Sequence, residues 1–343
     1  MLVKLNDKQE ALRDSMLIRA GALNSNLAHP QAKRHLDNND NLTRSLADSF
    51  APIRSGSSAS SITASGLSSS DFKNVFADTL AIISSQSFTQ NMSHRELCSI
   101  LEMPNFNEHS FPKVGVAFTL EKRTEGAESK NVINLLPGSG LTSKVDTYSK
   151  QIKLSREVLA NDEIEAITAH FSAGGTAALR TEKTLAYGLL ESNPTLGDSE
   201  AMFHTSHGNL MTAATFDLAA IGLAVAAMRR QTLQGSSEAA DLKARFLVVS
   251  PELEAEALAI VHLNGLGLEV VSSPLIGALN WYLLADPSVA PVIGLLLLDK
   301  KNRGPEVAAI RPKKAFDGTT FAIRHDAGVV ALGRSGAVKG IAL

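Results

Sequence analysis

Cysteine is almost absent from this 343-residue sequence, which contains only Cys98. No disulfide can form within the chain, so its stability must come from packing or from assembly with other chains. A lone cysteine is usually a small buried apolar residue. We therefore expect no catalytic role for Cys98.

An excess of charge of either sign is also missing. The chain has 33 basic and 35 acidic side chains, which gives a net charge of −2. This balance argues against a strongly basic nucleic-acid-binding module, although one face could still be locally basic. The hydrophobic fraction of 44% and the charged fraction of 20% are ordinary for a globular protein. The length suffices for one large domain or two smaller ones.

Long apolar runs are lacking as well. The most apolar segment, Val289–Leu298, contains Pro291 and Gly294, and it is far shorter than the roughly 20 residues of a membrane-spanning helix. Charges at Lys4 and Glu10, with no apolar block after them, predict that there is no signal peptide. We expect the protein to remain in the cytoplasm until it joins a larger structure.

The N-terminal third divides at a serine-rich segment. Apolar residues recur at loosely helical spacing among charges in residues 1–50, which predicts helix. Residues 55–70 are mostly serine, glycine and other small residues, a composition typical of flexible linkers that proteases cut easily. We place the main boundary there. Residues 71–103 resume a helical periodicity that ends near Pro104.

Residues 113–154 read as two strands joined by a long polar loop. The loop contains the turn-forming run Pro137–Gly140, and the return strand is expected at Tyr148–Leu154. A connection of this length without a core of its own is unusual in a compact domain and often serves a partner.

The longest helical pattern spans residues 162–191. The pair Gly174 and Gly175 should interrupt it, so that Thr176–Leu190 forms a second piece that stops before Pro194. A further helix is expected at Ala213–Gln231.

The C-terminal half alternates short strands with one helix. That helix should begin after Ser250 as its N-cap and stop at Asn264–Gly265. Antiparallel strands are expected to close the chain after Arg311. The sum is a mixed α+β architecture. The strands predicted before the closing ones are Phe246–Val249, Leu268–Val271, Trp281–Leu284 and Ile293–Leu298.

Two histidines are the strongest candidates for chemistry. His204 and His207 are spaced by three and could share a helical face and bind zinc. However, Gly208 and the polar neighbours favour a loop, and a catalytic zinc needs three protein ligands, of which no third stands nearby. We expect loop hydrogen bonding rather than a metal.

Other candidates are weaker still. Ser139 lies between two glycines but lacks the G-x-S-x-G pattern, and the acids of Asn161–Glu163 precede a helix, where acids cap amide groups. The basic runs Lys122–Arg123 and Lys300–Arg303 read as solvated faces, with contact to another subunit or to DNA as the alternative. No glycine-rich phosphate-binding loop occurs. We assign no catalytic, cofactor-binding or metal-binding residue.

Three blocks of the chain resemble a known family. They are Gly66–Phe76, Tyr148–Glu163 and Met202–Leu210, and weaker similarity extends the likeness over about residues 66–340. The sequence is similar to major capsid proteins of tailed phages of the Hong Kong 97 type, especially the Mu-like group and capsid proteins fused to a prohead protease. Glu163 stands where this family often has a second aspartate, and the resemblance does not extend to the first 65 residues.

The resemblance implies a domain layout. Since hexamers and pentamers built from one sequence require flexible joints, we expect the glycines at positions 126, 138, 140, 174 and 175 to act as hinges. The expected parts are residues 1–65 as an assembly segment, cleaved or retained; 66–113 as the N-arm; 114–154 as the extended E-loop; 155–194 with 305–343 as the peripheral domain with a spine helix; and 195–304 as the axial domain.

The resemblance also implies a function. Copies would assemble in the host cytoplasm into hexamers and pentamers of an icosahedral virion shell, with a portal protein, a possible decoration or scaffolding protein and packaged double-stranded DNA as partners. One rival is an encapsulin-like nanocompartment shell. A rival of another class is a metal-dependent enzyme that uses His204 and His207.

Overall fold

The chain forms two compact units, each assembled from separate stretches of sequence. The computed structural model describes residues 7–24, 26–32, 69–111, 141–155, 157–158, 164–213, 215–232, 239–298, 304–310 and 318–342. The first unit comprises Met1–Asn91, Thr147–Thr181 and Lys300–Asp326, and the second comprises Met92–Asp146, Glu182–Asp299 and Ala327–Leu343. Helix α8 (Ile164–Ser192) and strand β11 (Gly318–Ala331) each contribute residues to both units.

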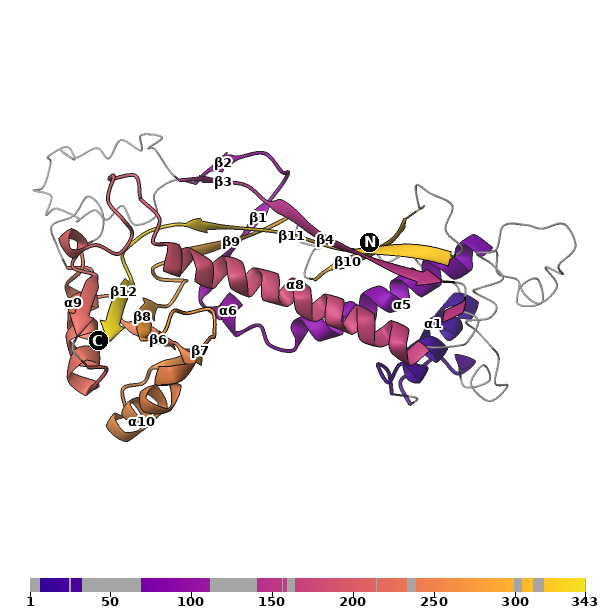
Figure 1. Cartoon of the computed structure of the whole chain (residues 1–343), viewed down its shortest axis with the longest axis horizontal. Coiled ribbons are helices and arrows are strands. Elements are labelled where there is room, and N and C mark those ends of the chain that lie inside the picture. The colour runs from indigo at the N-terminus through magenta and orange to yellow at the C-terminus, as the bar shows by residue number, and fades with distance from the viewer. Residues whose placement is uncertain are drawn as a thin grey trace, which may run out of the picture. The chain divides into compact units, whose positions relative to one another are not determined.

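The first unit packs helices against a small antiparallel pairing of strands. Phe321 of β11 lies at its centre, with the rings of Phe76 and Phe171 edge-on to it at centroid distances of 5.7 and 5.8 Å. Leu12 of the N-terminal helix is buried in the same apolar cluster. The other elements of this unit are α1 (Asp7–Arg19), α5 (Ser69–Thr89), β4 (Asp146–Ser155), which pairs with β11, and β10 (Glu306–Ile310), antiparallel to β11 (Figure 1).

The expected break at Gly174 and Gly175 is wrong, because α8 runs without interruption through both residues. A side chain at Gly175 would collide with the backbone of Ser84 in α5, whose carbonyl carbon would lie 2.9 Å from the new Cβ. A side chain at Gly174 would overlap Ile323 of β11. The two glycines therefore allow α5 and β11 to approach the helix closely, and tertiary packing outweighs their low helix propensity.

The second unit contains a five-stranded sheet that is buried on both faces. Its alternate side chains divide between two apolar clusters. Leu247, Trp281 and Val338 point to the side of helices α9 (Leu218–Arg230) and α10 (Glu254–Asn264), and Phe246 and Tyr282 point to the other side. The strand order is β5 (Leu210–Ala213), β12 (Ala337–Ala342), β8 (Asn280–Ala285), β6 (Ala244–Val249) and β7 (Glu269–Ser272).

A second set of strands in this unit pairs segments that are far apart in sequence. β1 (Cys98–Met103) runs parallel to β9 (Ile293–Leu298). β9 in turn pairs antiparallel with the Ala327–Ala331 part of β11. The short strands β2 (His109–Ser110) and β3 (Thr142–Ser143) form a separate antiparallel pair.

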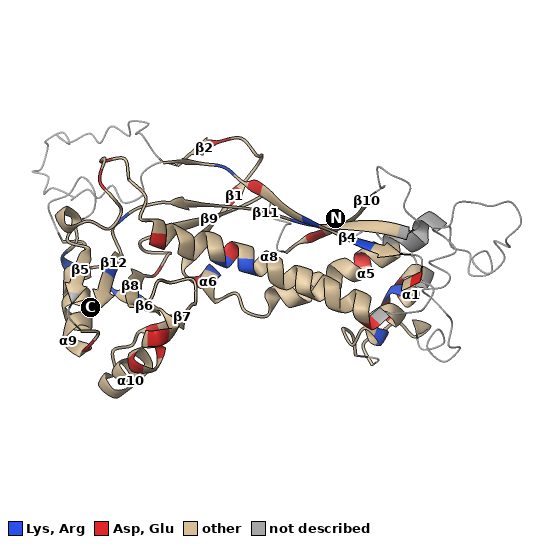
Figure 2. Cartoon of the chain, viewed as in Figure 1, with Lys and Arg blue, Asp and Glu red and all other residues tan. Residues whose placement is uncertain are grey.

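The helices of the second unit begin and end at defined signals. Asp217 caps α9 (Leu218–Arg230) by accepting a hydrogen bond from the Ala220 N–H at 2.8 Å. Ser250 makes no side-chain capping bond, so the capping role predicted for it is wrong. The 3-10 turn η2 (Pro251–Leu253) instead leads into α10 (Glu254–Asn264), which ends at a left-handed Gly265. Figure 2 shows acidic residues at the start of α10 and basic ones at the end of α9, the arrangement that helix dipoles favour.

The predicted strands at 246–249, 268–271, 281–284 and 293–298, and the return strand Tyr148–Leu154, are confirmed within one or two residues. Two helix predictions are wrong in part. Residues 71–103 are not helical to their end, because α5 stops at Thr89 and β1 follows the short helix α6 (Ser93–Glu96). The helix expected from Ala213 begins only at Leu218, because Ala213 is the last residue of β5 and Asp217 caps the helix.

Several expectations concern residues outside the described ranges. These include most of the serine-rich linker, the outgoing strand and loop of the expected E-loop, the glycines at 126, 138 and 140, and the runs Lys122–Arg123 and Lys300–Arg303. Ser139 and Asn161–Glu163 also lie there. Among the described helices, none has the length and apolar character that a membrane crossing requires.

Candidate functional site

His207 is held in a hydrogen-bonded loop of the second unit. It ends the 3-10 turn η1 (Thr205–His207), and its side chain is 5% exposed. Its Nε2 lies 3.2 Å from a carboxylate oxygen of Asp198 and 3.0 Å from Arg334 Nη1, and its Nδ1 lies 3.4 Å from the Met202 carbonyl oxygen. Both ring nitrogens thus face partners within the loop.

Arg334 also pairs directly with Asp198. Partial burial alone would raise the pKa of Asp198, but the Glu200 backbone N–H and the positive charge of Arg334 outweigh it and hold that pKa below its usual value. The ionised carboxylate of Asp198 is therefore favoured in this loop, where it lies between the side chains of Arg334 and His207.

His204 caps the same turn. Its Nδ1 accepts from the Ser206 N–H at 3.3 Å and lies 2.7 Å from the Ser206 hydroxyl oxygen. The two imidazole centroids are 6.0 Å apart. Across the part of the chain that the structure describes, no three His, Cys, Asp or Glu side chains are grouped to hold a metal ion. The geometry assigns both histidines to shaping the loop between α8 and β5.

A second polar cluster is buried where α6 meets α8 in the second unit. The Glu182 side chain is 0% exposed. Arg95 donates to it through Nε at 2.8 Å and Nη2 at 2.7 Å, in the paired geometry typical of arginine and carboxylate. His94, also fully buried, places its Nε2 2.9 Å from the same carboxylate. This cluster fastens the segment before β1 to the long helix.

Sequence reasoning missed the Glu182 cluster. His94 and Arg95 form an unremarkable charged run, and Glu182 lies 87 residues from Arg95 in a helix with other charges. The one available signal was a glutamate on the side of the helix that also carries Leu179 and Ala186, both buried. The periodicity of apolar residues does not reveal which charged residue elsewhere in the chain pairs with such a buried glutamate.

Cys98 is unsuited to nucleophilic chemistry. Burial, aided by the negative charge of Glu182, raises the pKa of its thiol to about 12, and the thiolate is the reactive form. Burial also raises the pKa of the nearby Tyr187 hydroxyl to about 12. The expectation of a buried cysteine is confirmed.

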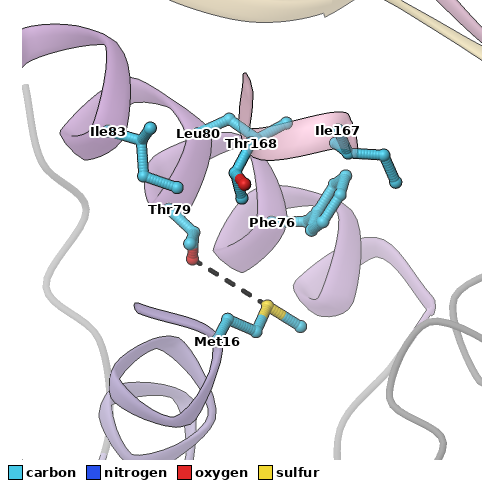
Figure 3. Close-up of a pocket in the computed structure, with 7 residues that line it drawn as sticks. All are labelled: Met16, Phe76, Thr79, Leu80, Ile83, Ile167 and Thr168. Atoms are coloured by element: carbon cyan, nitrogen blue, oxygen red, sulfur yellow. Dashed lines mark hydrogen bonds between the residues drawn. The ribbon is translucent and has the colours of Figure 1, made fainter. Parts of the chain in front are cut away.

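A small cavity lies where α1, α5 and α8 meet in the first unit. Figure 3 shows side chains of all three helices around it, including Met16, Phe76 and Ile167. Its volume is about 10 Å³, which is room for at most one water. Thr79 directs its hydroxyl toward the Met16 sulfur at 4.0 Å. The cavity is a packing gap beneath a docked N-terminal helix and does not accommodate a substrate.

Comparisons with known proteins relate the chain to one family. The model of a family described as phage capsid protein matches residues 140–340, which is more than half of the sequence. No curated protein matches the chain in sequence.

Solved structures are similar in fold at low sequence identity. A virus-like particle from Pyrococcus furiosus has 12% identity, covering 76% of this chain and 97% of that one, with a TM-score of 0.50. The capsid of cyanophage P-SCSP1u has 12% identity, covers 74% and 88%, and has a TM-score of 0.46. The procapsid of bacteriophage JBD30 has 13% identity, covers 78% and 75%, and has a TM-score of 0.43.

Proposed function

Because this chain belongs to the phage capsid protein family, we propose that it is the major capsid protein of a tailed phage, whose copies assemble as hexamers and pentamers into an icosahedral head around the DNA genome. It has the α+β fold of Hong Kong 97-type capsid proteins and is a structural protein of the virion, not an enzyme. The observation that carries the proposal is the family match over residues 140–340, which include α8 and most of the strands of the two large sheets.

The exposure of β4 supports assembly through extended segments. A strand that packs on its own core buries every second side chain. In β4 the first six side chains, Asp146 to Gln151, are all exposed, and burial is complete only at Leu154. A strand with both faces uncovered suits contact with a neighbouring subunit. It follows directly on residues 114–145, so we propose that 114–154 is the E-loop.

We propose the rest of the domain layout from the same family resemblance and from the described elements. Helix α8, 29 residues long, suits the spine of a peripheral domain formed by residues 155–194 and 305–343. Residues 195–304 would form the axial domain and 66–113 the N-arm. For residues 1–65 we propose retention, because α1 is buried in the apolar cluster of the first unit.

We assign the chain to the Mu-like or protease-fusion subgroup on its sequence blocks at 66–76, 148–163 and 202–210. A portal protein is the expected partner at one vertex, with a decoration or scaffolding protein as a further partner. An encapsulin-like compartment is the rival with the same fold, and the contents of purified particles separate the two: nucleic acid favours the phage head and an enclosed enzyme favours the compartment.

Sedimentation velocity of the purified full chain tests the proposed function. We expect a major component of very large, uniform particles, since many modest contacts per copy sum to a durable shell. A protein that sediments as a monomer at every concentration would contradict the proposal.

A further inference from the structure

Helix α9 leaves one side uncovered in the second unit. Its buried residues face the five-stranded sheet. The helical period places Leu218, Gly222, Ala226 and Arg230 in a row on the outer side, about one turn apart. Leu218 is 42% exposed, and Leu223 beside this row is 65% exposed. The outer side of α9 is therefore apolar along most of its length and basic at its end.

Gly222 in the middle of this row leaves a gap in the helix surface. Glycine in a helix interior costs about 1 kcal/mol relative to alanine. An added Cβ at Gly222 would meet no atom within 4 Å, so no contact of the described residues requires glycine there. At Gly175, by contrast, the missing side chain admits the backbone of α5. The gap at Gly222 has room for a side chain that comes from another molecule.

Helix α10 leaves a matching side uncovered. Ala257 and Val261 are buried against the sheet. The opposite side carries Leu263, which is 85% exposed, together with Leu258, which is 38% exposed, and the exposed Ala259. Exposed apolar side chains grouped on one face mark an interaction surface.

The charged ends of these two surfaces are opposite in sign. Glu252, Glu254 and Glu256 are exposed at the start of α10 and in the turn before it, and α9 ends in Arg229 and Arg230 (Figure 2). Arg229 has an acidic partner in its own copy. The other four form no salt bridge with any residue that the structure describes. Complementary charges determine which surfaces pair and in which direction.

We propose that α9 docks against α10 of a second copy of this chain, with the two helices antiparallel. Arg229 and Arg230 then meet the glutamates at the start of α10, and Leu263 enters the gap at Gly222. Gly222 and Arg229 are about two helical turns apart, and so are Glu256 and Leu263. Both contacts therefore form in one register. The inference rests on the proposed function and names one contact through which the copies assemble.

A contact between α9 and α9 of a second copy fits the charges less well. In an antiparallel pair of that kind, the arginines would meet Asp217 at the other end of α9. One oxygen of its carboxylate already accepts from the Ala220 N–H, and the other accepts from the Thr215 hydroxyl. The glutamates and Leu263 of α10 would stay uncovered. The charge pattern therefore favours α10 as the partner of α9.

Charge reversal tests this pairing in two variants of the full chain. One carries Arg229→Glu with Arg230→Glu, and the other carries Glu254→Arg with Glu256→Arg. In either variant alone like charges meet, so the concentration at which half of the chain is associated should rise roughly tenfold or more. An equal mixture of the two should associate as the natural chain does, because each α9 then meets an α10 of opposite charge.

A steric change provides an independent test. Gly222→Gln fills the gap that Leu263 is proposed to enter, and Gly222→Ala is its control. Neither change should harm the fold, because an added Cβ meets no atom of its own copy and both residues favour helix over glycine. Association should weaken by roughly tenfold for Gly222→Gln and far less for Gly222→Ala. Sedimentation velocity measures association, and far-UV circular dichroism checks the folding of every variant.

The outcomes separate this inference from the proposed function. If both charge variants associate as the natural chain does, the inference is wrong and the proposed function stands. The same holds if the mixture does not recover association, or if only the α9 variant is impaired, which would indicate an α9–α9 contact. A natural chain that stays monomeric at every concentration would remove both.

Discussion

The carboxylate of Glu182 is fully shielded from solvent, so its charge depends on the groups around it. Removing one partner of a buried ion pair leaves an uncompensated charge, whereas replacing the whole pair by apolar residues of similar volume is often neutral. The paired hydrogen bonds from Arg95 are therefore the main protection of this charge.

Arg95→Ala should lower the free energy of unfolding by about 3 kcal/mol, measured as a shift of the urea midpoint. The double variant Arg95→Met with Glu182→Leu should recover part of the loss, because it removes the buried charge but leaves His94 without its carboxylate partner. Arg245→Ala, which removes an exposed pair with Asp286, is the control and should move the midpoint little. If the double variant were no more stable than Arg95→Ala, the unpaired charge of Glu182 would not be the cause of the stability lost in the single variant.

Asp198 should make the second unit sensitive to acid. Its pKa is lowered in the folded chain, so its stabilising effect is present above the unfolded value near pH 4 and is lost as the pH falls through the lower folded value. Thermal unfolding between about pH 2 and 6 should therefore show a shallower loss of stability for Asp198→Asn than for the natural chain. Parallel curves for the two proteins would contradict this.

Among the elements, helix α8 contains a position, Gly175, at which packing requires glycine. Gly175→Ala should destabilise the chain by about 3 kcal/mol, because its Cβ would collide with the Ser84 backbone, which cannot rotate away. Gly188→Ala in the same helix has nothing within 4 Å of its Cβ and should stabilise by up to about 1 kcal/mol through helix propensity. Denaturant unfolding measures both changes, and equal effects would refute the packing role of Gly175.

The N-terminal helix should likewise be part of the first unit's core. Leu12 is 3% exposed, whereas Leu27 is 80% exposed. Leu12→Ala should cost about 3 kcal/mol of stability by leaving a cavity, and Leu27→Ala should have no measurable effect in the same unfolding assay. If the two variants were equally stable, α1 would contribute little to this core, and retention of residues 1–65 would lose its support.

The sequence predicts elements well where burial alone decides them. Strands such as Ile293–Leu298 are near-continuous apolar runs because both faces of their sheets are covered. Prediction from sequence fails where pairing with a distant segment determines the secondary structure. β1 follows a helical pattern and becomes a strand through pairing with β9, almost 200 residues later. The pair Gly174 and Gly175 predicts a helix break from sequence, but in the structure it allows close contacts with Ser84 and Ile323.

The same limit applies to the sites. The loop role of His204 and His207 could be predicted from Gly208 and the polar neighbours, and the loop hydrogen bonds confirm it. The Glu182 cluster could not be predicted, because it joins residues from two elements that local periodicity treats separately.

At the scale of the whole molecule, the account rests on surfaces that a single copy leaves open. β4 is exposed on both faces along most of its length, and β5 is the last strand of its sheet among the strands that the structure describes. Extended segments that reach neighbours bury surface that a compact unit cannot, and repeated contacts between identical copies sum to high avidity. We conclude that each copy is stable as two compact units. We conclude further that it performs its role only in an assembly of copies.

Cryo-electron microscopy of the purified full chain tests this claim most directly. The account predicts closed icosahedral shells in which β4 of each copy lies against a neighbouring subunit. Particles in which the exposed side chains of β4 contact no neighbouring subunit, or a field of single separate copies at high concentration, would contradict it.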